Sequence, residues 1–350
     1  MLPSVPVLAL DLAYWQTTAI KALIVAIIVP TTAVILGVVF LFKMMSWMQS
    51  RLGPQEAGPR GLLQLLADGG KFLQKEDIFP TNADKWVFAA APIVTFVSTF
   101  LVYVIIPVGP DAVVSDLDTG IFYALAVSSL SVIGILMAGW ASANKYSLLG
   151  GLRAAGQLIA YELPMVLAVV GVVIQAGSLS MNAIIGAQAE GEMFGLGFLG
   201  NPYVITQFVG FAIFMIAVQA ELGQTPFDMP IAESELVTGY LTEYSGLRFL
   251  LFFIGEFASA FGFAAIAAAL FLGGWAVPSS WGISTDSDFY WVLGPALMFA
   301  KTMFISFLIF WFRFTYPRVR EDQLQRFAWK VLIPIALVNI LVTGVLKVVF

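Results

Sequence analysis

The chain has 350 residues, of which 60% are hydrophobic and 11% are charged, with a mean hydropathy of +0.91 and a formal net charge of −5. Soluble domains carry roughly a quarter charged residues, so this composition indicates an integral membrane protein. The absence of Cys and His excludes the usual protein ligands of zinc, haem and iron–sulfur clusters. It also leaves proton transfer to carboxylates, Lys, Tyr and water.

Eight apolar runs are each near the roughly 20 residues that a bilayer core requires. They are continuously apolar and do not alternate, which predicts helices. The runs lie near 20–42, 86–107, 121–141, 156–176, 203–221, 248–274, 289–312 and 328–348. We therefore expect an all-α integral membrane protein, with residues 1–350 as one multi-span domain without an internal repeat.

The loops between these runs alternate in charge. Basic residues lie in the first, third and seventh loops: Lys43, Arg51, Arg60, Lys71, Lys75, Lys85, Lys145, Arg153, Arg313, Arg318, Arg320 and Arg326. The second, fourth and sixth loops contain no Lys or Arg, only Asp111, Asp116, Asp118, Glu190, Glu192, Asp286 and Asp288. By the positive-inside rule, the odd-numbered loops face the cytoplasm and both termini face the outer side. No cleavable signal peptide is apparent, because residues 1–20 lack a basic segment and contain Asp11.

Two loops have structure of their own. In the first, residues near 60–75 read as an amphipathic helix that would lie in the membrane interface. The fifth loop, 222–247, is acidic although it belongs to the basic side. From Gln219 to Glu256, a single cation, Arg248, accompanies six carboxylates: Glu221, Asp228, Glu233, Glu235, Glu243 and Glu256.

The fifth loop reads as a packed segment. Pro226 and Pro230 fix its backbone, and Phe227 and Tyr240 are interspersed among its charges. Helical spacing predicts a helix within 231–244. The competing interpretation is a solvated charged face.

Several ionisable residues lie inside or beside the apolar runs. Glu162 follows Arg153, Gln157 and Tyr161, whose spacing of four places them on one helix face. An intramembrane ionisable group usually faces a bundle interior, a partner or a water chain. Glu162 could instead extend to interfacial water.

Three further ionisable residues lie deeper in the apolar runs and would also face a bundle interior, a partner or a water chain: Glu221, Glu256 and Lys301. Burial would suit these carboxylates to carrying protons. A structural ion pair, for example Glu256 with Lys301, is the competing interpretation.

The fifth-loop stretch TPFDMPIAESELVTGYLTEYSG resembles the signature loop of the H subunit of proton-pumping NADH–quinone oxidoreductase (respiratory complex I), the bacterial counterpart of the first mitochondrially encoded subunit. The segments 51–71, 139–162 and 312–334 resemble its first, third and seventh loops. The resemblance covers most of the chain in order and fits eight helices.

The resemblance implies a membrane subunit that forms the quinone-access chamber and couples quinone reduction to proton translocation through buried carboxylates. This chain would bind no cofactor, with quinone as the substrate and with iron–sulfur clusters and FMN on partner subunits. The implied partners are other membrane-arm subunits, the cluster-bearing hydrophilic connecting subunits, quinone and the lipid bilayer, and not nucleic acid. The implied location is the bacterial inner (plasma) membrane.

The same resemblance implies two groups of site residues, with no catalytic or metal-binding residue in the chain. The quinone chamber would include Arg51, Gln64, Asp68, Lys71, Phe227, Asp228 and Arg248. The proton path would include Arg153, Tyr161, Glu162, Glu221, Glu233, Glu235, Glu243 and Glu256.

The chain departs from the family pattern in two places. Leu41 and Phe42 replace an acidic–basic pair before Lys43, and Gln224 stands where Arg is frequent. The departures leave open a homologous membrane subunit of a ferredoxin-linked complex or a membrane-bound hydrogenase. A carboxylate-based secondary transporter and a purely structural anchor are further alternatives.

Overall fold

The computed structural model describes residues 14–110, 112–191, 200–281 and 288–349, and in these ranges it contains helices and no β-strand. Asp111, Glu192 and Asp286, on which the topology prediction drew, lie outside the described residues, as does Asp11 of the signal-peptide prediction. The helices in the predicted apolar runs are α1 (Tyr14–Leu36), α4 (Lys85–Val102), α5 (Gly120–Ser128), α6 (Leu130–Ala141), α7 (Lys145–Ala176), α9 (Tyr203–Thr206), α10 (Phe208–Glu221), α12 (Gly246–Leu272), α13 (Asp288–Thr315) and α15 (Ile333–Val349). The other α-helices are α2 (Met45–Met48), α3 (Gln64–Gln74), α8 (Met181–Glu190), α11 (Glu233–Leu236) and α14 (Glu321–Phe327).

Within the described ranges, seven helical segments are long and apolar enough to cross a membrane. They are Trp15–Met48, Lys85–Ile105, Gly120–Ala141, Lys145–Ala176, Gly246–Leu272, Phe289–Thr315 and Glu321–Val349. This confirms the prediction of an all-α integral membrane protein.

The fifth predicted span, 203–221, is interrupted at Gln207, whose φ of −114° and ψ of 37° are not helical. The buried amide of Gln207 instead bonds α15, because it donates to Thr343 Oγ1 (2.8 Å) and accepts from Asn339 Nδ2 (2.9 Å). The 14 residues of α10 extend about 21 Å at 1.5 Å per residue, less than the ~30 Å hydrocarbon core. α10 alone therefore does not reach the length of a span.

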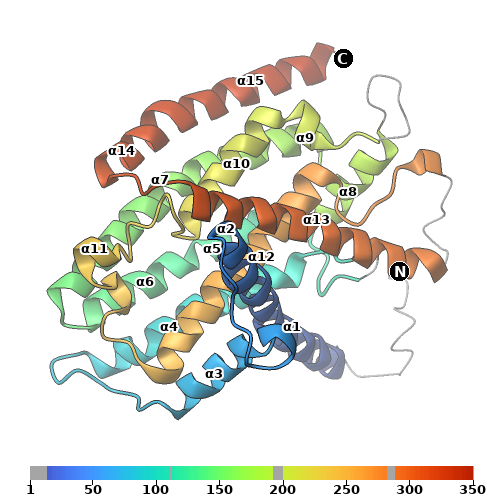
Figure 1. Ribbon diagram of the computed structural model, residues 1–350. Coiled ribbons are helices and arrows are strands. Elements are labelled where there is room, and N and C mark those ends of the chain that lie inside the picture. The colour runs from blue at the N-terminus through green and yellow to red at the C-terminus, as the bar shows by residue number, and fades with distance from the viewer. Residues whose placement is uncertain (1–13, 111, 192–199, 282–287, 350) are drawn as a thin grey trace.

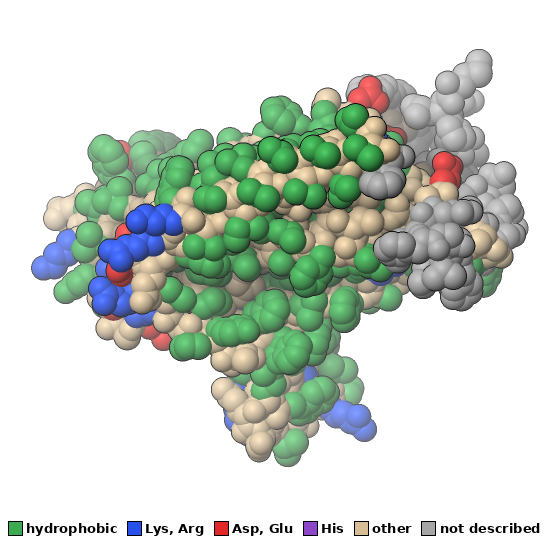
Figure 2. All heavy atoms as spheres, turned by 90° about the horizontal axis from the view of Figure 1, so that it is seen from above, with side chains coloured by type: hydrophobic (Ala, Val, Ile, Leu, Met, Phe, Trp, Pro, Cys, Tyr) green, Lys and Arg blue, Asp and Glu red, His purple; other side chains and the backbone are tan. Residues whose placement is uncertain are grey.

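The odd-numbered loops meet at one end of the bundle, here called the charged end, which comprises loops 49–84, 142–144, 222–245 and 316–320. Asp84 N donates to Ala141 O (3.1 Å), and Val319 N donates to Pro226 O (3.0 Å). Figure 2 shows a cluster of Lys and Arg side chains at the end where α11 and α14 lie in Figure 1, with hydrophobic side chains over most of the face beyond, whereas Asp and Glu side chains are visible at both ends.

The even-numbered loops meet at the opposite end. Ile121 N donates to Leu179 O (3.1 Å), and Gln188 Nε2 donates to Ala269 O (2.9 Å). The structure therefore separates the loops into the two groups that the charge alternation predicted. Which group faces the cytoplasm remains a prediction.

The interior and the lipid-facing surface belong to different helices. Residues 264–271 of α12 are at most 1% exposed, because the other helices surround this one (Figure 1). On α15, which lies at the outside of the bundle, Leu341, Val345 and Val348 are more than half exposed. An apolar surface of this kind on a span is suited to contact with lipid or another subunit.

Small residues let α6, α7 and the fifth loop approach at backbone distance. A Cβ atom on Gly151 would lie 3.2 Å from Cα of Gly139, and one on Gly150 would lie 2.6 Å from the backbone nitrogen of Tyr240. Glycine is common where membrane helices pack this closely. The contacts place the fifth loop directly against α7.

Two predicted boundaries were wrong. Residues 231–244 do not form one helix: α11 ends at Leu236, and a 3₁₀ turn follows at Gly239–Leu241. Val237, which follows α11, and Gly239, the first residue of the 3₁₀ turn, have φ values of 65° and 55°, which an α-helix does not tolerate. The fourth span begins at Lys145 and not near 156, and Gly150 in this additional segment packs against the fifth loop.

The amphipathic pattern near 60–75 does form a helix, α3, with none of its residues fully buried. Leu66 and Leu73 are 56% and 65% exposed. Phe72 stacks on Phe249 of α12 with ring centroids 5.3 Å apart. Placement in the membrane interface remains a prediction.

We expect Gly239→Ala to destabilise the fifth loop. Gly239 has a positive φ, which costs an alanine about 1–2 kcal/mol, and the added Cβ would overlap the carbonyl oxygen of Pro230. The temperature of half-inactivation of the assembled complex in native membranes should fall. Gly186→Ala, inside α8 with nothing within 4 Å of the added Cβ, is the matched control and should leave it unchanged or raise it. An unchanged temperature for Gly239→Ala would contradict the tight contact.

Candidate functional site

The polar stripe that the spacing of four predicted on α7 faces the fifth loop. Gln157 Nε2 donates to the carbonyl oxygens of Ala220 and Phe227, both at 2.7 Å. Tyr161 packs on Phe227 with ring centroids 5.2 Å apart, and its hydroxyl donates to Leu324 O (3.1 Å) at α14. One face of α7 therefore holds both ends of the turn 221–226, which joins α10 to the fifth loop, and also contacts α14.

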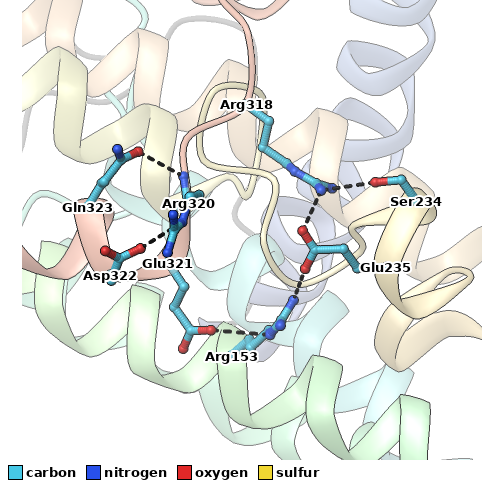
Figure 3. Close-up of polar contacts among 8 residues, drawn as sticks. All are labelled: Arg153, Ser234, Glu235, Arg318, Arg320, Glu321, Asp322 and Gln323. Carbon is cyan, nitrogen blue, oxygen red and sulfur yellow. Dashed lines mark hydrogen bonds and ion pairs between the residues drawn. The ribbon is translucent and has the colours of Figure 1, made fainter.

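A charge network completes this attachment at the charged end (Figure 3). Glu235 accepts hydrogen bonds from Arg153 Nη1 (2.6 Å) and Arg318 Nη2 (2.7 Å), one on each carboxylate oxygen. Arg153 Nε also contacts Glu321 (3.2 Å), and Arg318 Nη2 donates to Ser234 Oγ (3.0 Å). Glu235 thus joins α7, the fifth loop and the seventh loop.

The network favours the ionised form of Glu235. The hydrogen bond from Arg153 is the main cause that lowers the pKa of the carboxyl; partial burial opposes it, and the charges of Arg318 and Arg153 add to it. Because the pKa is lowered, the stabilisation is present at neutral pH and is lost only as the pH falls through the lowered pKa. The side chain is 44% exposed, so each ion pair contributes about 1 kcal/mol or less.

An internal cavity lies beneath the fifth loop, between α4, α6, α7 and α12. The space open to the centre of a water molecule is about 80 Å³, whereas one water needs roughly 10–15 Å³, so several waters fit. Its hydroxyl lining consists of Thr95, Ser98, Thr99, Tyr103, Ser128, Ser131, Tyr240 and Ser259. A cavity with this lining is polar enough to hold water inside an otherwise apolar bundle.

Glu221 and Glu256 line this same cavity. Oε2 of Glu221 is buried and has no hydrogen-bond partner among the described residues. Glu162 on α7 is near enough for its charge to act on Glu221. The structure therefore brings together three of the predicted proton-path carboxylates.

Glu256 forms an ion pair with Arg313 (3.2 Å), and not with Lys301 as the competing interpretation proposed. Lys301 Nζ instead donates to Gly274 O (2.7 Å), just beyond the end of α12. Glu256 lies in the first half of α12, whereas Lys301, on α13, bonds the backbone just past the C-terminal end of α12. The pair with Arg313 leaves Glu256 at the cavity wall with a compensating cation beside it.

Asp228 lies at a more open pocket of the charged end, with Thr225, Glu233, Ser234 and Arg318. Burial, the largest cause, raises the pKa of the Asp228 carboxyl to about 6. The negative charges of Glu256 and Glu233 raise it further, and the nearby arginines lower it. Asp228 is therefore suited to exchanging a proton near neutral pH.

An apolar groove lies between α1, α3 and α12, with a volume of about 490 Å³. Pro30, Ala33, Phe72, Leu250 and Phe253 form much of its wall. Asp68 and Lys71 also line the groove and form an ion pair (3.3 Å), with Gln64 Nε2 donating to Asp68 (3.2 Å). Two predicted chamber residues, Asp68 and Lys71, therefore line the apolar groove, and a third, Gln64, bonds one of them.

The other predicted residues lie elsewhere at the charged end. Arg51 is exposed, and its Nε donates to Gln49 Oε1 (2.7 Å). Arg248 pairs with Asp77 (3.0 Å) and lies over the ring of Phe79. The structure does not bring either arginine to the groove.

Glu243 and Glu233 differ in their surroundings. Glu243 accepts a hydrogen bond from Asn144 Nδ2 (2.6 Å), which links the fifth loop to the start of α7. Glu233 is exposed and lines the pocket of Asp228. Neither residue lines the internal cavity.

The sequence reasoning missed the partners Arg313, Arg318 and Glu321 and the hydroxyl lining of the cavity. One signal was present, because Thr95, Ser98 and Thr99 recur at helical spacing on one face of an apolar run. No sequence signal assigned the arginines of the seventh loop to particular carboxylates. Among the described residues, no cluster of three or more carboxylates could hold a metal ion.

Comparison with known proteins identifies the family. A family model described as NADH dehydrogenase matches residues 20–344. The H subunit of NADH-quinone oxidoreductase from Brevibacillus brevis is 46% identical over 336 residues, which cover 95% of this chain and 94% of that protein. The chain belongs to this H subunit family. The H subunit from Bacillus cereus (strain B4264) is 45% identical over 315 residues, which cover 90% of this chain and 89% of that protein.

Membership of the H subunit family confirms the resemblance found in the sequence. It makes the chain a membrane subunit of an oxidoreductase complex, and so decides against a secondary transporter. The long apolar helices fit a multi-pass membrane protein.

We expect Glu235→Gln to loosen the fifth loop, because a neutral amide cannot keep two charge-assisted bonds to arginine. Amide hydrogen exchange in 231–244 of the assembled complex should become roughly fivefold faster, which corresponds to about 1 kcal/mol. The control is Asp322→Asn, because Asp322 contacts only the exposed Arg320 within this network. Equal exchange in Glu235→Gln and wild type would show that the network does not hold the loop.

Proposed function

We propose that this chain forms the quinone-access route of an NADH–quinone oxidoreductase and couples quinone reduction to proton translocation. The observation that carries the proposal is the internal cavity, which places Glu221 and Glu256 among hydroxyl groups directly beneath a loop held by charge pairs. The names of the relatives, which refer to NADH and quinone, support the reaction.

The groove between α1, α3 and α12 is suited to quinone entry. Its walls are apolar, and two of its helices belong to the membrane-spanning bundle. Small-molecule sites are commonly apolar clefts of a few hundred Å³ with a few polar groups, here Asp68 and Lys71. A hydrophobic quinone could therefore pass from the lipid along the groove toward the charged end.

Quinone reduction requires two electrons and two protons. This chain contains no Cys or His, so we propose that an iron–sulfur cluster of a hydrophilic partner subunit delivers the electrons at the charged end. An uncompensated anion in a low-dielectric chamber is very costly, so each electron favours proton uptake by nearby groups.

The carboxylates under the loop would supply this coupling. The charges of Glu162 and Glu221 act on each other, as do those of Asp228 and Glu256. Titrations of interacting groups are shared properties of the set. A change in protonation at the quinone chamber can therefore shift proton occupancy at the cavity, and a bias of a few kcal/mol is enough to shift a two-state loop.

The proposed orientation places the charged end in the cytoplasm of a bacterial cell, with both termini on the outer side of the plasma membrane. The asymmetry of Lys and Arg between the loop groups supports it. The charged end would then contact the hydrophilic connecting subunits, and the exposed apolar helices would contact lipid and other membrane-arm subunits.

Glu221→Gln tests the coupling role. Removing the ionisable group from the cavity should reduce both quinone-reductase rate and proton pumping, by about tenfold or more if Glu221 carries protons. Both are measured on the assembled complex in sealed membrane vesicles. Glu190→Gln, an exposed carboxylate at the end of α8, should behave as wild type. Unchanged reductase rate together with unchanged pumping in Glu221→Gln would refute the assignment.

Gly70→Trp tests the quinone route. Gly70 lines the groove, and a Cβ there meets no atom within 4 Å, so an indole can fill the groove without displacing the backbone. We expect a higher KM for a long-chain quinone, by about tenfold, because roughly 1.4 kcal/mol of lost binding corresponds to that factor. Gly344→Trp on α15, also without neighbours within 4 Å, is the control. An unchanged KM in Gly70→Trp would place quinone entry elsewhere.

A further inference from the structure

Three buried glutamines surround the turn that joins α10 to the fifth loop. Gln157 is 1% exposed, and Gln219 and Gln224 are each 2% exposed. Gln157 belongs to α7 and the other two precede or form the turn. A primary amide buried this completely needs hydrogen-bond partners on both its nitrogen and its oxygen.

Two of these amides use their donors to hold the backbone. Gln157 Nε2 bonds the two carbonyl groups that flank the turn, and Gln219 Nε2 donates to Thr225 O (2.8 Å). Their oxygens are buried and find no hydrogen-bond partner within the described ranges. Each of these side chains therefore stabilises the turn through its nitrogen, while its amide oxygen remains a buried acceptor without a partner in the described ranges.

Gln224 differs from both. Neither Nε2 nor Oε1 has a hydrogen-bond partner in the part of the chain that the structure describes. Its backbone, by contrast, is held, because its N–H donates to Gln219 O (3.3 Å) and its carbonyl accepts from Phe227 N (2.8 Å). The turn thus forms without the amide, and an apolar side chain would avoid the cost of desolvating an unpaired polar group.

Gln224 lies in the chain between residues that line two different pockets. Glu221 and Gly223 line the internal cavity, and Thr225 lines the open pocket of Asp228. Gln224 lies between these wall residues in the chain, and Oε2 of Glu221 is a further buried acceptor without a partner in the described ranges. Five buried polar atoms in this region therefore have no partner among the described residues. They are Oε1 of Gln157, Oε1 of Gln219, Oε2 of Glu221, and Nε2 and Oε1 of Gln224.

We propose that Gln224, with Gln157 and Gln219, holds ordered water molecules that connect the cavity of Glu221 to the pocket of Asp228. A buried water typically makes two to four hydrogen bonds, and the unpaired atoms include both donors and acceptors. Gln224 is then a positioning residue for proton transfer, because its amide orients the water molecules and keeps its own protons. Along the water chain, each transfer breaks one O–H bond and forms another. The transport role rests on the proposed function, whereas the water site does not.

The decisive experiment is a structure of the intact complex in lipid at a resolution that shows ordered water, for wild type and for Gln224→Met. We expect density at hydrogen-bond distance from both amide atoms of Gln224 in wild type. In Gln224→Met this density should be lost, while the bonds from Gln157 and Gln219 to the backbone remain. A wild-type Gln224 amide that is paired only with protein atoms, of this chain or of a partner subunit, would overturn the proposal.

Functional measurements on the same variants separate positioning from a merely structural role. In sealed vesicles, Gln224→Met should pump protons about tenfold more slowly, the factor that the loss of one ordinary hydrogen bond gives, and should show a changed solvent deuterium isotope effect. Gln224→Asn, which keeps an amide, should recover part of the rate. Gln175→Met is the matched control, because both amide atoms of Gln175 already bond Thr206.

The results distinguish the two proposals. Ordered water at Gln224, together with normal pumping in Glu221→Gln, would retain the water site and refute the proposed function. Absence of that water, together with lost pumping in Glu221→Gln, would refute the water site and retain the proposed function. A normal pumping rate and isotope effect in Gln224→Met would refute the positioning role of Gln224.

Discussion

The attachment of the fifth loop to α7 is the constraint on which the site depends. A loop with several carboxylates cannot remain beside an apolar bundle unless its backbone groups and charges find partners. Gln157 satisfies two carbonyl groups of the turn, and the paired arginines satisfy Glu235. These partners come from α7 and the seventh loop, so the position of the fifth loop depends on both segments.

The carboxylates of the site differ in how exposed they are to solvent and in how many arginines they contact. Glu235 lies at the surface with two arginines, Glu256 lies at the cavity wall with one, and Glu221 has a buried oxygen with none among the described residues. The cost of ionisation rises as partners and water are withdrawn. A gradient of this kind separates groups that stay charged from groups that can exchange protons, within one continuous set of contacts.

The sequence predicted the bundle, the separation of the loops and the polar face of α7, because hydrophobic runs and helical spacing are local properties of the chain. It could not predict that Glu256 pairs with Arg313, since the choice between that arginine and Lys301 depends on the depth of each residue in the folded bundle. It also placed a helix across 231–244, where contacts with α7 enforce positive φ values that local propensity opposes. The sequence did not predict which candidate chamber residues lie together. Arg248, for example, forms an ion pair with Asp77 and does not line the groove.

The uninterrupted α7 has a consequence for how this chain can vary. One 32-residue helix carries the loop anchors Arg153, Gln157 and Tyr161, then Glu162 directly after them, and it also packs against α15. Inserting a single residue between Arg153 and Glu162 would rotate one part against the other by about 100° and shift it by about 1.5 Å. A change in the length of α7 would therefore shift Arg153 relative to Glu162 even if every side chain were retained.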